Sequence, residues 1–223
     1  MLGDQFYPSV MAGLEIFSAD TLLFEPRSNY SYSSYAWNLV SAIMENVAKQ
    51  DFLTFMERNV FNPLEMHSIS PEHRDSSLTN LATFYETKHL IEFSDFRFFN
   101  LRRKAPHVDN SYKWAGGGFI STTEDIVNFL HSHSKSGYLT DESLNILMNP
   151  QTIASAGTTN YGIGWRKRYG NNNEVLYGHT GGSVGGTTYA FIAIDYNVIV
   201  VITSNLSDAS FGNLPNDIFE IYY

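Results

Sequence analysis

Residues 106–122 read Pro106-His107-Val108-Asp109-Asn110-Ser111-Tyr112-Lys113-Trp114-Ala115-Gly116-Gly117-Gly118-Phe119-Ile120-Ser121-Thr122. A tryptophan followed closely by three glycines predicts a tight turn, because glycine adopts backbone conformations that other residues avoid. Ser121-Thr122-Thr123-Glu124 has the pattern of a capping box, which satisfies the free N–H groups at the start of a helix. The stretch therefore predicts a turn that leads into a helix, whose inner face carries Ile126, Val127, Phe129 and Leu130.

Helical patterns occur on both sides of this stretch. Between residues 35 and 50 apolar residues recur with the period of an amphipathic helix, at Ala36, Leu39, Val40, Ile43, Met44 and Val47. Asp51 can cap a second helix that runs to about Phe61 and ends at Asn62-Pro63. Asp141 can cap another, which ends before Pro150. A final helix is predicted from about Asn213 onward, whereas residues 1–29 are weakly patterned.

Strand patterns dominate the last third of the chain. Residues 161–168, 174–179, 187–194 and 198–204 are predicted as strands, with a turn at 195–197. Residues 82–100 alternate well enough to predict an excursion of short strands. No repeat and no Pro/Gly-rich linker divides the sequence, so residues 1–223 are predicted to form a single domain. Helices, then an antiparallel meander, then a closing helix indicate an α+β fold, with an antiparallel sheet flanked by helices.

The composition excludes several classes of protein. Of the 223 residues, 43% are hydrophobic and 17% are charged, which is ordinary for a globular protein and unlike a disordered or fibrous chain. The net charge is −9, and the two short basic clusters, at 102–104 and 166–168, are too small to indicate a nucleic-acid partner. The second cluster is explained by solvated positions on a strand. No cysteine is present, which excludes disulfides and thiolate catalysis. The longest apolar run, at 198–203, is strand-sized, so no membrane span is expected.

Two short segments have a chemical reason to be functional, and the first is Tyr30-Ser31-Tyr32-Ser33-Ser34-Tyr35. It precedes the helix predicted at 35–50, and its serines could simply cap that helix. Alternatively, a phenol could act as a general base or acid while a neighbouring small polar side chain orients a substrate amide. A phenol has a pKa near 10, so it would need nearby positive charge to ionise at neutral pH.

The second segment is His179-Thr180-Gly181-Gly182-Ser183-Val184-Gly185-Gly186, at the end of one predicted strand. Glycines there allow a ligand backbone to approach an exposed strand edge, and a cation and a hydroxyl beside that edge could hold a carboxylate. The alternative is a flexible glycine-rich hairpin whose histidine is an ordinary polar side chain.

Taken in order, the motifs resemble those of the class C β-lactamase and penicillin-binding-protein superfamily. They are Phe-x-Pro-x-x-x-Tyr-x-Tyr-Ser-Ser before a long helix, Asn-Pro-Leu-Glu-Met closing the next helix, and His-Thr-Gly on a late strand. The 106–122 stretch and the residues from His179 to Gly185 are similar to serine β-lactamase-like proteins of the mitochondrial type. The likeness runs from about Phe24 to the last helix. It implies a β-lactamase/transpeptidase-like fold.

The resemblance also implies site residues. Tyr32 matches the tyrosine of the second motif and Ser34 its third residue, and both would serve catalysis. His179, Thr180 and Gly181 match the third motif and would bind the substrate. The backbone N–H of Gly182 would be one oxyanion-hole donor. Residues 114–118 would line the cleft as a wall, unless they form only the tight turn described above. No metal or organic cofactor is implied.

The resemblance does not extend to the catalytic serine of the superfamily. The mechanism needs Ser-x-x-Lys at a helix start, where three positions bring the amine to the face of the hydroxyl. The single match, Ser132-His133-Ser134-Lys135, lies late in the chain at a predicted helix end and is rejected. We therefore expect a partial domain that lacks its N-terminal strands and nucleophile helix. Two smaller departures are Arg27 in place of a common glycine, and His179, whose charge near pH 6.5 depends on pH.

Two functions from different classes follow. The first is a serine hydrolase of peptidase type that cleaves peptide or amide substrates through an acyl-enzyme. The second is a non-catalytic scaffold on the same fold, which assembles into homo-oligomers or filaments. By resemblance alone, the parent protein is expected in the mitochondrion, with a link to lipid metabolism. Lys113 and His107 are expected to be surface residues.

Overall fold

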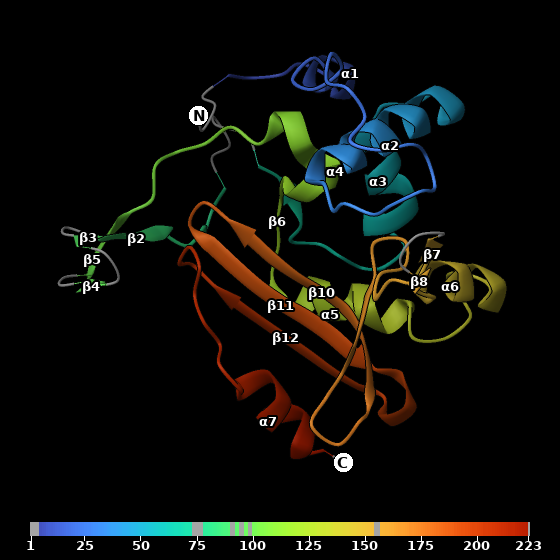
Figure 1. Cartoon of the computed structure of the whole chain (residues 1–223), viewed down its shortest axis with the longest axis vertical. Helices are drawn as coiled ribbons and strands as arrows, with labels where there is room; N and C mark the ends of the chain where they lie inside the picture. Colours follow the sequence, from blue (N-terminus) through green and yellow to red (C-terminus); the bar gives the residue numbers. More distant parts are fainter. Residues whose placement is uncertain are drawn as a thin grey trace.

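Four antiparallel strands from the last third of the chain form the main sheet, in the order β12-β11-β10-β9 (Figure 1). They are β9 (Arg166–Tyr169), β10 (Val175–Ser183), β11 (Gly186–Ala193) and β12 (Val198–Ser204). The computed structural model describes residues 5–72, 78–89, 92–93, 96–97, 100–153 and 157–222. The predictions of β11 and β12 are confirmed to within one residue. β10 runs four residues further than predicted and so includes Thr180 to Ser183.

The prediction of a strand at 161–168 is wrong in its first half, because β9 begins only at Arg166. Residues 161–165 form a loop, in which the N–H of Gly162 donates to the carbonyl of Trp165 at 2.7 Å. Gly164 has a φ of +77°, which an L side chain rarely adopts. The N–H of Ile163 bonds to the carbonyl of Leu147 at 2.7 Å. The two glycines thus let the chain turn close against the end of the preceding helix.

The sheet is buried on both faces by helices. Along β11, Tyr189, Phe191 and Ala193 face α7 (Leu214–Glu220) and pack in one cluster with Phe219. Ile192, which points to the opposite face, packs with Leu130 of α5 (Thr123–Ser132) and with Leu144 and Met148 of α6 (Asp141–Met148). Successive side chains of a strand point to opposite faces, so one strand supplies both cores. The predicted α+β fold with a sheet flanked by helices is confirmed.

The start residues of two helices differ from their predictions. The N-cap of α5 is Thr122, whose hydroxyl accepts from the N–H of Asp125 at 3.3 Å, so the predicted capping box is one residue too early. The N-cap of α6 is Thr140, and Asp141 is the first helical residue instead of the cap. A hydroxyl and a carboxylate in adjacent positions can both cap a helix, so sequence alone does not separate them.

A second group of helices lies on the β10 side of the sheet (Figure 1). It contains α1 (Val10–Leu14), α2 (Ser34–Ala48), α3 (Phe52–Met56), a π-helical turn (Glu57–Phe61) and α4 (Trp114–Gly117). Trp114 is buried in one cluster with Val10, Ala42 and Phe52. A Cβ on Gly116 would lie 2.7 Å from the carbonyl oxygen of Ser34. The glycine run therefore allows α4 to press against the first turn of α2, and the predicted turn is a short helix.

The apolar face of α2 points away from the rest of the chain. The residues that α2 buries are Asn38, Ser41 and Ala42. Its exposed large side chains are Tyr35, Leu39, Val40, Ile43 and Val47. The helix is amphipathic as its period predicts, but the described residues leave the apolar face uncovered.

The predicted excursion at 82–100 forms short strand pairs to one side of the sheet (Figure 1). β2 (Tyr85–His89) pairs with β5 (Asn100–Lys104), and β3 (Glu92–Phe93) pairs with β4 (Phe96–Arg97). Positions 90–91, 94–95 and 98–99 of this prediction lie outside the described residues. The N–H of Tyr85 bonds to the carbonyl of Asn205 at 2.8 Å, which ties the excursion to the end of β12. Two further pairs, β1 (Ser70–Pro71) with β6 (Phe119–Ile120) and β7 (Thr152–Ile153) with β8 (Gly157–Thr158), complete the described strands.

Gly178 is the position on β10 where the sheet has least room. A Cβ there would overlap the carbonyl oxygen of Ala190 and lie 2.6 Å from the Cα of Phe191. Both are backbone atoms of the neighbouring strand, so the clash cannot be relieved by a rotamer change. We expect Gly178→Ala to lower the free energy of unfolding by about 1–3 kcal/mol in urea melts. The matched control is Gly182→Ala on the same strand, where a Cβ meets nothing within 4 Å. Equal stabilities of the two variants would contradict the packing described for β10 and β11.

Candidate functional site

The structure brings Tyr32 and His179 together, although they come from opposite ends of the sequence. Their ring centroids lie 6.0 Å apart. Tyr161, from the loop before β9, contacts both rings, at 5.9 Å from Tyr32 and 5.6 Å from His179. Tyr30 lies 6.1 Å from Tyr161 on the other side. These four side chains, Tyr30, Tyr32, Tyr161 and His179, are called the aromatic cluster below.

Tyr161 is the hydrogen-bonding centre of the aromatic cluster. Its hydroxyl lies 3.0 Å from Nε2 of His179, and the side chain of Trp37, on α2, lies close enough to lower its pKa. Burial raises the pKa of Tyr161 to about 12, and the nearby Tyr32 and Tyr30 contribute in the same direction. Tyr161 is therefore a neutral phenol at any physiological pH.

His179 is held on both sides of its ring. Nδ1 bonds to the carbonyl oxygen of Thr180, and Nε2 to Tyr161. Burial lowers the pKa of His179, and the positive charge of Arg166 lowers it further, whereas the hydrogen bond to Thr180 raises it. Because the net direction is downward, the neutral imidazole dominates near neutral pH.

Arg166 supplies the positive charge next to the aromatic cluster. It is the first residue of β9, it pairs with Gly178 across the sheet, and it forms an isolated bridge with Tyr161. Its charge lowers the pKa of Tyr30, which burial raises, and it acts in the same direction on Tyr161. Among the described residues, no carboxylate pairs with Arg166 within 4.0 Å. The guanidinium, which the sequence explained as a solvated strand position, is thus available to an anion.

Ser34 lies apart from the rings, at the first turn of α2. It is half-buried, and its carbonyl faces Gly116 of α4. The N-cap residue is Ser33, whose side chain makes no capping hydrogen bond. Capping therefore does not account for the serines of this segment. Tyr32, just before the helix, is 48% exposed, so its hydroxyl is open to solvent.

Thr180, Gly181 and Gly182 occupy an exposed strand edge. β9 pairs with β10 only as far as Gly178, while β11 continues to pair with it to Ser183. Among the described strands, none pairs with the β9 side of β10 beyond Gly178. All three residues are exposed. An extended ligand backbone could add to this edge by main-chain hydrogen bonds.

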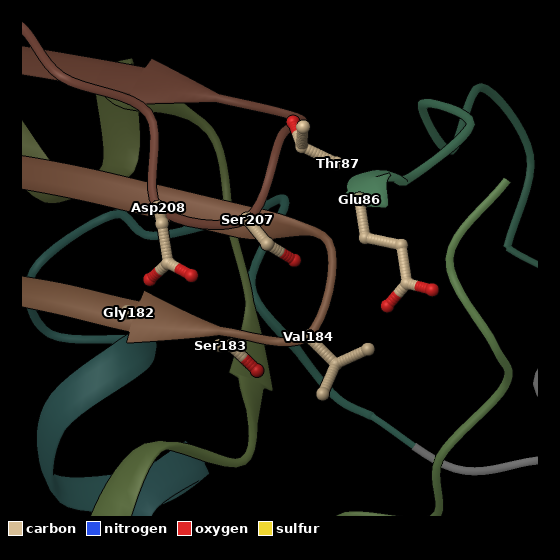
Figure 2. Close-up of a pocket in the computed structure, with 7 residues that line it drawn as sticks. All are labelled: Glu86, Thr87, Gly182, Ser183, Val184, Ser207 and Asp208. Carbon is tan, nitrogen blue, oxygen red and sulfur yellow. The ribbon is translucent and has the colours of Figure 1, made fainter. Parts of the chain in front are cut away.

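A pocket of about 700 Å³ opens at the end of this edge (Figure 2). The hairpin between β10 and β11 forms one wall, β2 faces it, and the loop after β12 closes a third side. Its lining residues are Glu86, Thr87, Gly182, Ser183, Val184, Ser207 and Asp208. Glu86 is paired with Arg103, with 2.6 Å between Nε and the carboxylate, whereas Asp208 is exposed. The pocket is polar and adjoins Gly182.

Two other predicted features lie away from this region. Ser132 is the last residue of α5, and His133 packs against Phe129 and Trp165, so the only Ser-x-x-Lys match ends a helix as expected. Lys113 was expected at the surface, but it is half-buried, and burial lowers the pKa of its amine.

Among the described residues, no three His, Cys, Asp or Glu side chains gather to hold a metal ion, and no helix has the length and hydropathy to cross a membrane.

Sequence reasoning missed Tyr161, Trp37 and Arg166. One signal was present, because Tyr161-Gly162-Ile163-Gly164-Trp165 places two glycines inside a predicted strand, where they indicate close approach of another group. That group is Trp37, whose ring would lie 3.3 Å from a Cβ on Gly164. Arg166 had no distinguishing signal, because its role depends on where β9 begins.

Known proteins match this chain over most of its length. The family described as Beta-lactamase matches residues 6–220. The serine beta-lactamase-like protein LACTB, mitochondrial, of Mus musculus is 28% identical over 220 residues, which cover 86% of this chain and 37% of that protein. The chain thus spans about 37% of the length of the curated relatives that it matches first.

Solved structures agree on the fold. The penicillin binding protein from Bacillus halodurans has a TM-score of 0.75 at 19% identity, and the match covers 97% of this chain and 63% of that one. The D-amino acid amidase from Ochrobactrum anthropi, complexed with D-phenylalanine, has a TM-score of 0.74 at 20% identity, with 99% and 71% covered. The predicted β-lactamase/transpeptidase-like fold and the predicted resemblance are both confirmed, and they support a serine-hydrolase kind of function. The chain belongs to the beta-lactamase family.

Proposed function

We propose that this chain forms the tyrosine- and histidine-bearing half of a serine hydrolase site of peptidase type, which cleaves peptide or other amide bonds. The observation that carries the proposal is the meeting of Tyr32 and His179, at 6.0 Å between ring centroids, beside the unpaired edge of β10. Two motifs far apart in the sequence converge where an extended substrate could lie. The structurally similar D-amino acid amidase from Ochrobactrum anthropi is also known in complex with L-phenylalanine amide, which supports the choice of bond.

Each site residue has one role in this proposal. Tyr32 and the lysine of the Ser-x-x-Lys segment together take the proton of the attacking serine and pass it to the leaving nitrogen, and Ser34 orients the substrate amide. The N–H of Gly182 stabilises the oxyanion. His179, Thr180 and Gly181 form the edge that binds the substrate's carboxylate end, and Arg166 supplies the charge that such a carboxylate needs. The proposed mechanism uses no metal ion.

The chemistry balances without a cofactor. The serine oxygen forms a bond to the carbonyl carbon, the carbon–nitrogen bond breaks, and the amine leaves with the serine's proton. Water then attacks the acyl ester in the same way, releases the acid and restores the serine. The serine itself belongs to a Ser-x-x-Lys segment outside these 223 residues in our proposal, because Ser132 ends a helix. We likewise propose that residues 1–223 act as a single partial domain.

Labelling with a fluorophosphonate or a penicillin tests the assignment. A longer protein that contains this sequence and a Ser-x-x-Lys segment should become labelled at that serine, as located by peptide mass spectrometry. The 223-residue chain alone should remain unlabelled. Labelling of a serine within the 223 residues, Ser132 included, would contradict the proposal. So would a folded longer protein that reacts with neither probe.

A second candidate function is a non-catalytic scaffold that assembles with its own copies. The uncovered apolar face of α2, with Leu39, Ile43 and Val47, is the observation that favours it. Sedimentation of the chain tests this function, because Val47→Glu should dissociate an assembly built on that face. A monomer at all concentrations would oppose it. Because the relatives named LACTB are mitochondrial proteins by name, we propose the mitochondrion as the location, and the link to lipid metabolism stays a prediction.

A further inference from the structure

The hydrogen bonds around His179 form a chain with a fixed direction. Tyr161 is a neutral phenol, so its hydroxyl carries a single proton that it can donate. Its partner, at 3.0 Å, is Nε2 of His179. Nε2 therefore accepts, and it carries no proton in this arrangement.

The hydrogen bond on the other side of the ring fixes the position of the imidazole proton. Nδ1 of His179 bonds to the carbonyl oxygen of Thr180. A carbonyl oxygen only accepts, so Nδ1 must carry a proton. A neutral imidazole has one N–H, and the Thr180 carbonyl places it on Nδ1, so Nε2 is left to accept from the Tyr161 hydroxyl. The imidazolium form would need Nε2–H to donate as well, which would leave the hydroxyl proton of Tyr161 without its acceptor.

We propose that Tyr161 is a positioning residue of the candidate site, and that its hydroxyl holds His179 as the neutral tautomer with the proton on Nδ1. The inference rests on the proposed function for its importance to catalysis, but the tautomer itself does not depend on any turnover. The groups that face His179 are Tyr32 from the segment before α2, Tyr161 from the loop before β9, and Arg166 from β9. None of these is an anion that would favour a charged imidazole.

The consequence concerns what the His-Thr-Gly motif offers to a substrate. A histidine in place of lysine suggests a charge that appears as the pH falls below about 6.5. A neutral His179 offers the substrate a rigid, uncharged side chain instead of a positive charge. The permanent positive charge beside the site is that of Arg166. Burial also lowers the pKa of His179, so its charge should appear only in more acidic solution. The anion-binding charge of the site is therefore constant through neutral pH.

Long-range ¹H–¹⁵N spectra of the uniformly labelled full chain test the tautomer directly, with His179→Gln used to assign the signal. Near neutral pH the wild-type chain should show a protonated Nδ1 and an unprotonated Nε2 for His179. Tyr161→Phe keeps the ring but removes the donor to Nε2, so the Nε2–H tautomer should gain population. The pKa of His179 should also rise, because a hydrogen bond that favours the neutral form is lost.

The matched control is Tyr30→Phe, which changes a ring 6.1 Å from Tyr161 and leaves the Tyr161–His179 hydrogen bond in place. It should leave the tautomer unchanged. A wild-type His179 with its proton on Nε2 would overturn the proposal, and so would an unchanged tautomer and pKa in folded Tyr161→Phe. If that variant does not fold, the wild-type spectrum alone still decides. A negative labelling result with a confirmed tautomer would reject the proposed function and leave this inference standing.

Discussion

Phe219→Ala is expected to lower the free energy of unfolding by about 3–5 kcal/mol, the range for removing a fully buried phenylalanine. Phe219 is 0% exposed and lies at the centre of the cluster between α7 and the sheet. Its neighbours, Leu176 and Phe191, are also 0% exposed and belong to two adjacent strands. Strand side chains cannot collapse into the space left by the ring without moving the sheet, so much of the cavity should persist. Urea melts that follow circular dichroism measure the effect.

Ile221→Ala is the matched control for this core. Ile221 is two residues further along α7, at its C-cap, and its side chain is 73% exposed. Its removal should change the free energy of unfolding by less than about 0.5 kcal/mol, as for surface positions in general. If both variants had the same stability, α7 would not be packed on the sheet as described, and the layered arrangement of Figure 1 would be wrong there.

Most of β10, β11 and β12 was predictable, because helices cover both faces of the main sheet and turn residues separate the strands. β12 keeps its predicted bounds, since Asn197, with a φ of +53°, precedes it and an apolar run fills it. The prediction of a strand at 161–168 failed in its first half, because the residues before Arg166 turn at glycines and contact α6 and Trp37. A periodicity argument contains no information about such distant contacts.

The apolar face of α2 shows a different limit. The helical period identified the helix and its stripe of apolar residues, yet the described chain buries the opposite side, around Asn38 and Ser41. The amide of Asn38 bonds to the carbonyl of Tyr112, which lies within residues 106–122. That polar contact depends on where α4 lies, which no local pattern specifies. The period of the apolar residues identifies which of them share a face of the helix, but it does not identify what that face packs against.

The candidate site was half predictable. Tyr32 and His179 stand in recognisable motifs, and the structure places their rings together. Tyr161 and Arg166 lie in neither motif. They enter the site because β9 begins at Arg166, opposite Gly178 of β10. The charge and hydrogen bonding of the site therefore come from residues that sequence reasoning assigned to a plain strand.

Tyr32→Phe is expected to reduce the rate of penicillin labelling by about 10²–10⁴-fold, the usual contribution of a positioned proton-transfer group. The substitution removes one oxygen and keeps the ring that contacts Tyr161 and His179. Binding of the probe should persist, because the β10 edge and Arg166 are untouched. The loss should thus fall on the acylation step and not on the half-saturating probe concentration. The measurement uses the longer protein with its Ser-x-x-Lys serine, followed by time-resolved labelling at several probe concentrations.

Tyr35→Phe is the control, because it removes a hydroxyl from the same segment at a ring that packs on Phe17, at 5.2 Å between centroids. Its labelling rate should equal that of the wild type, and thermal melts should show both variants folded. An unchanged acylation rate in Tyr32→Phe would assign the proton transfer to another group and remove the central step of the proposed mechanism. A loss in apparent affinity alone would make Tyr32 a binding residue, since only a group needed in the transition state lowers the acylation rate.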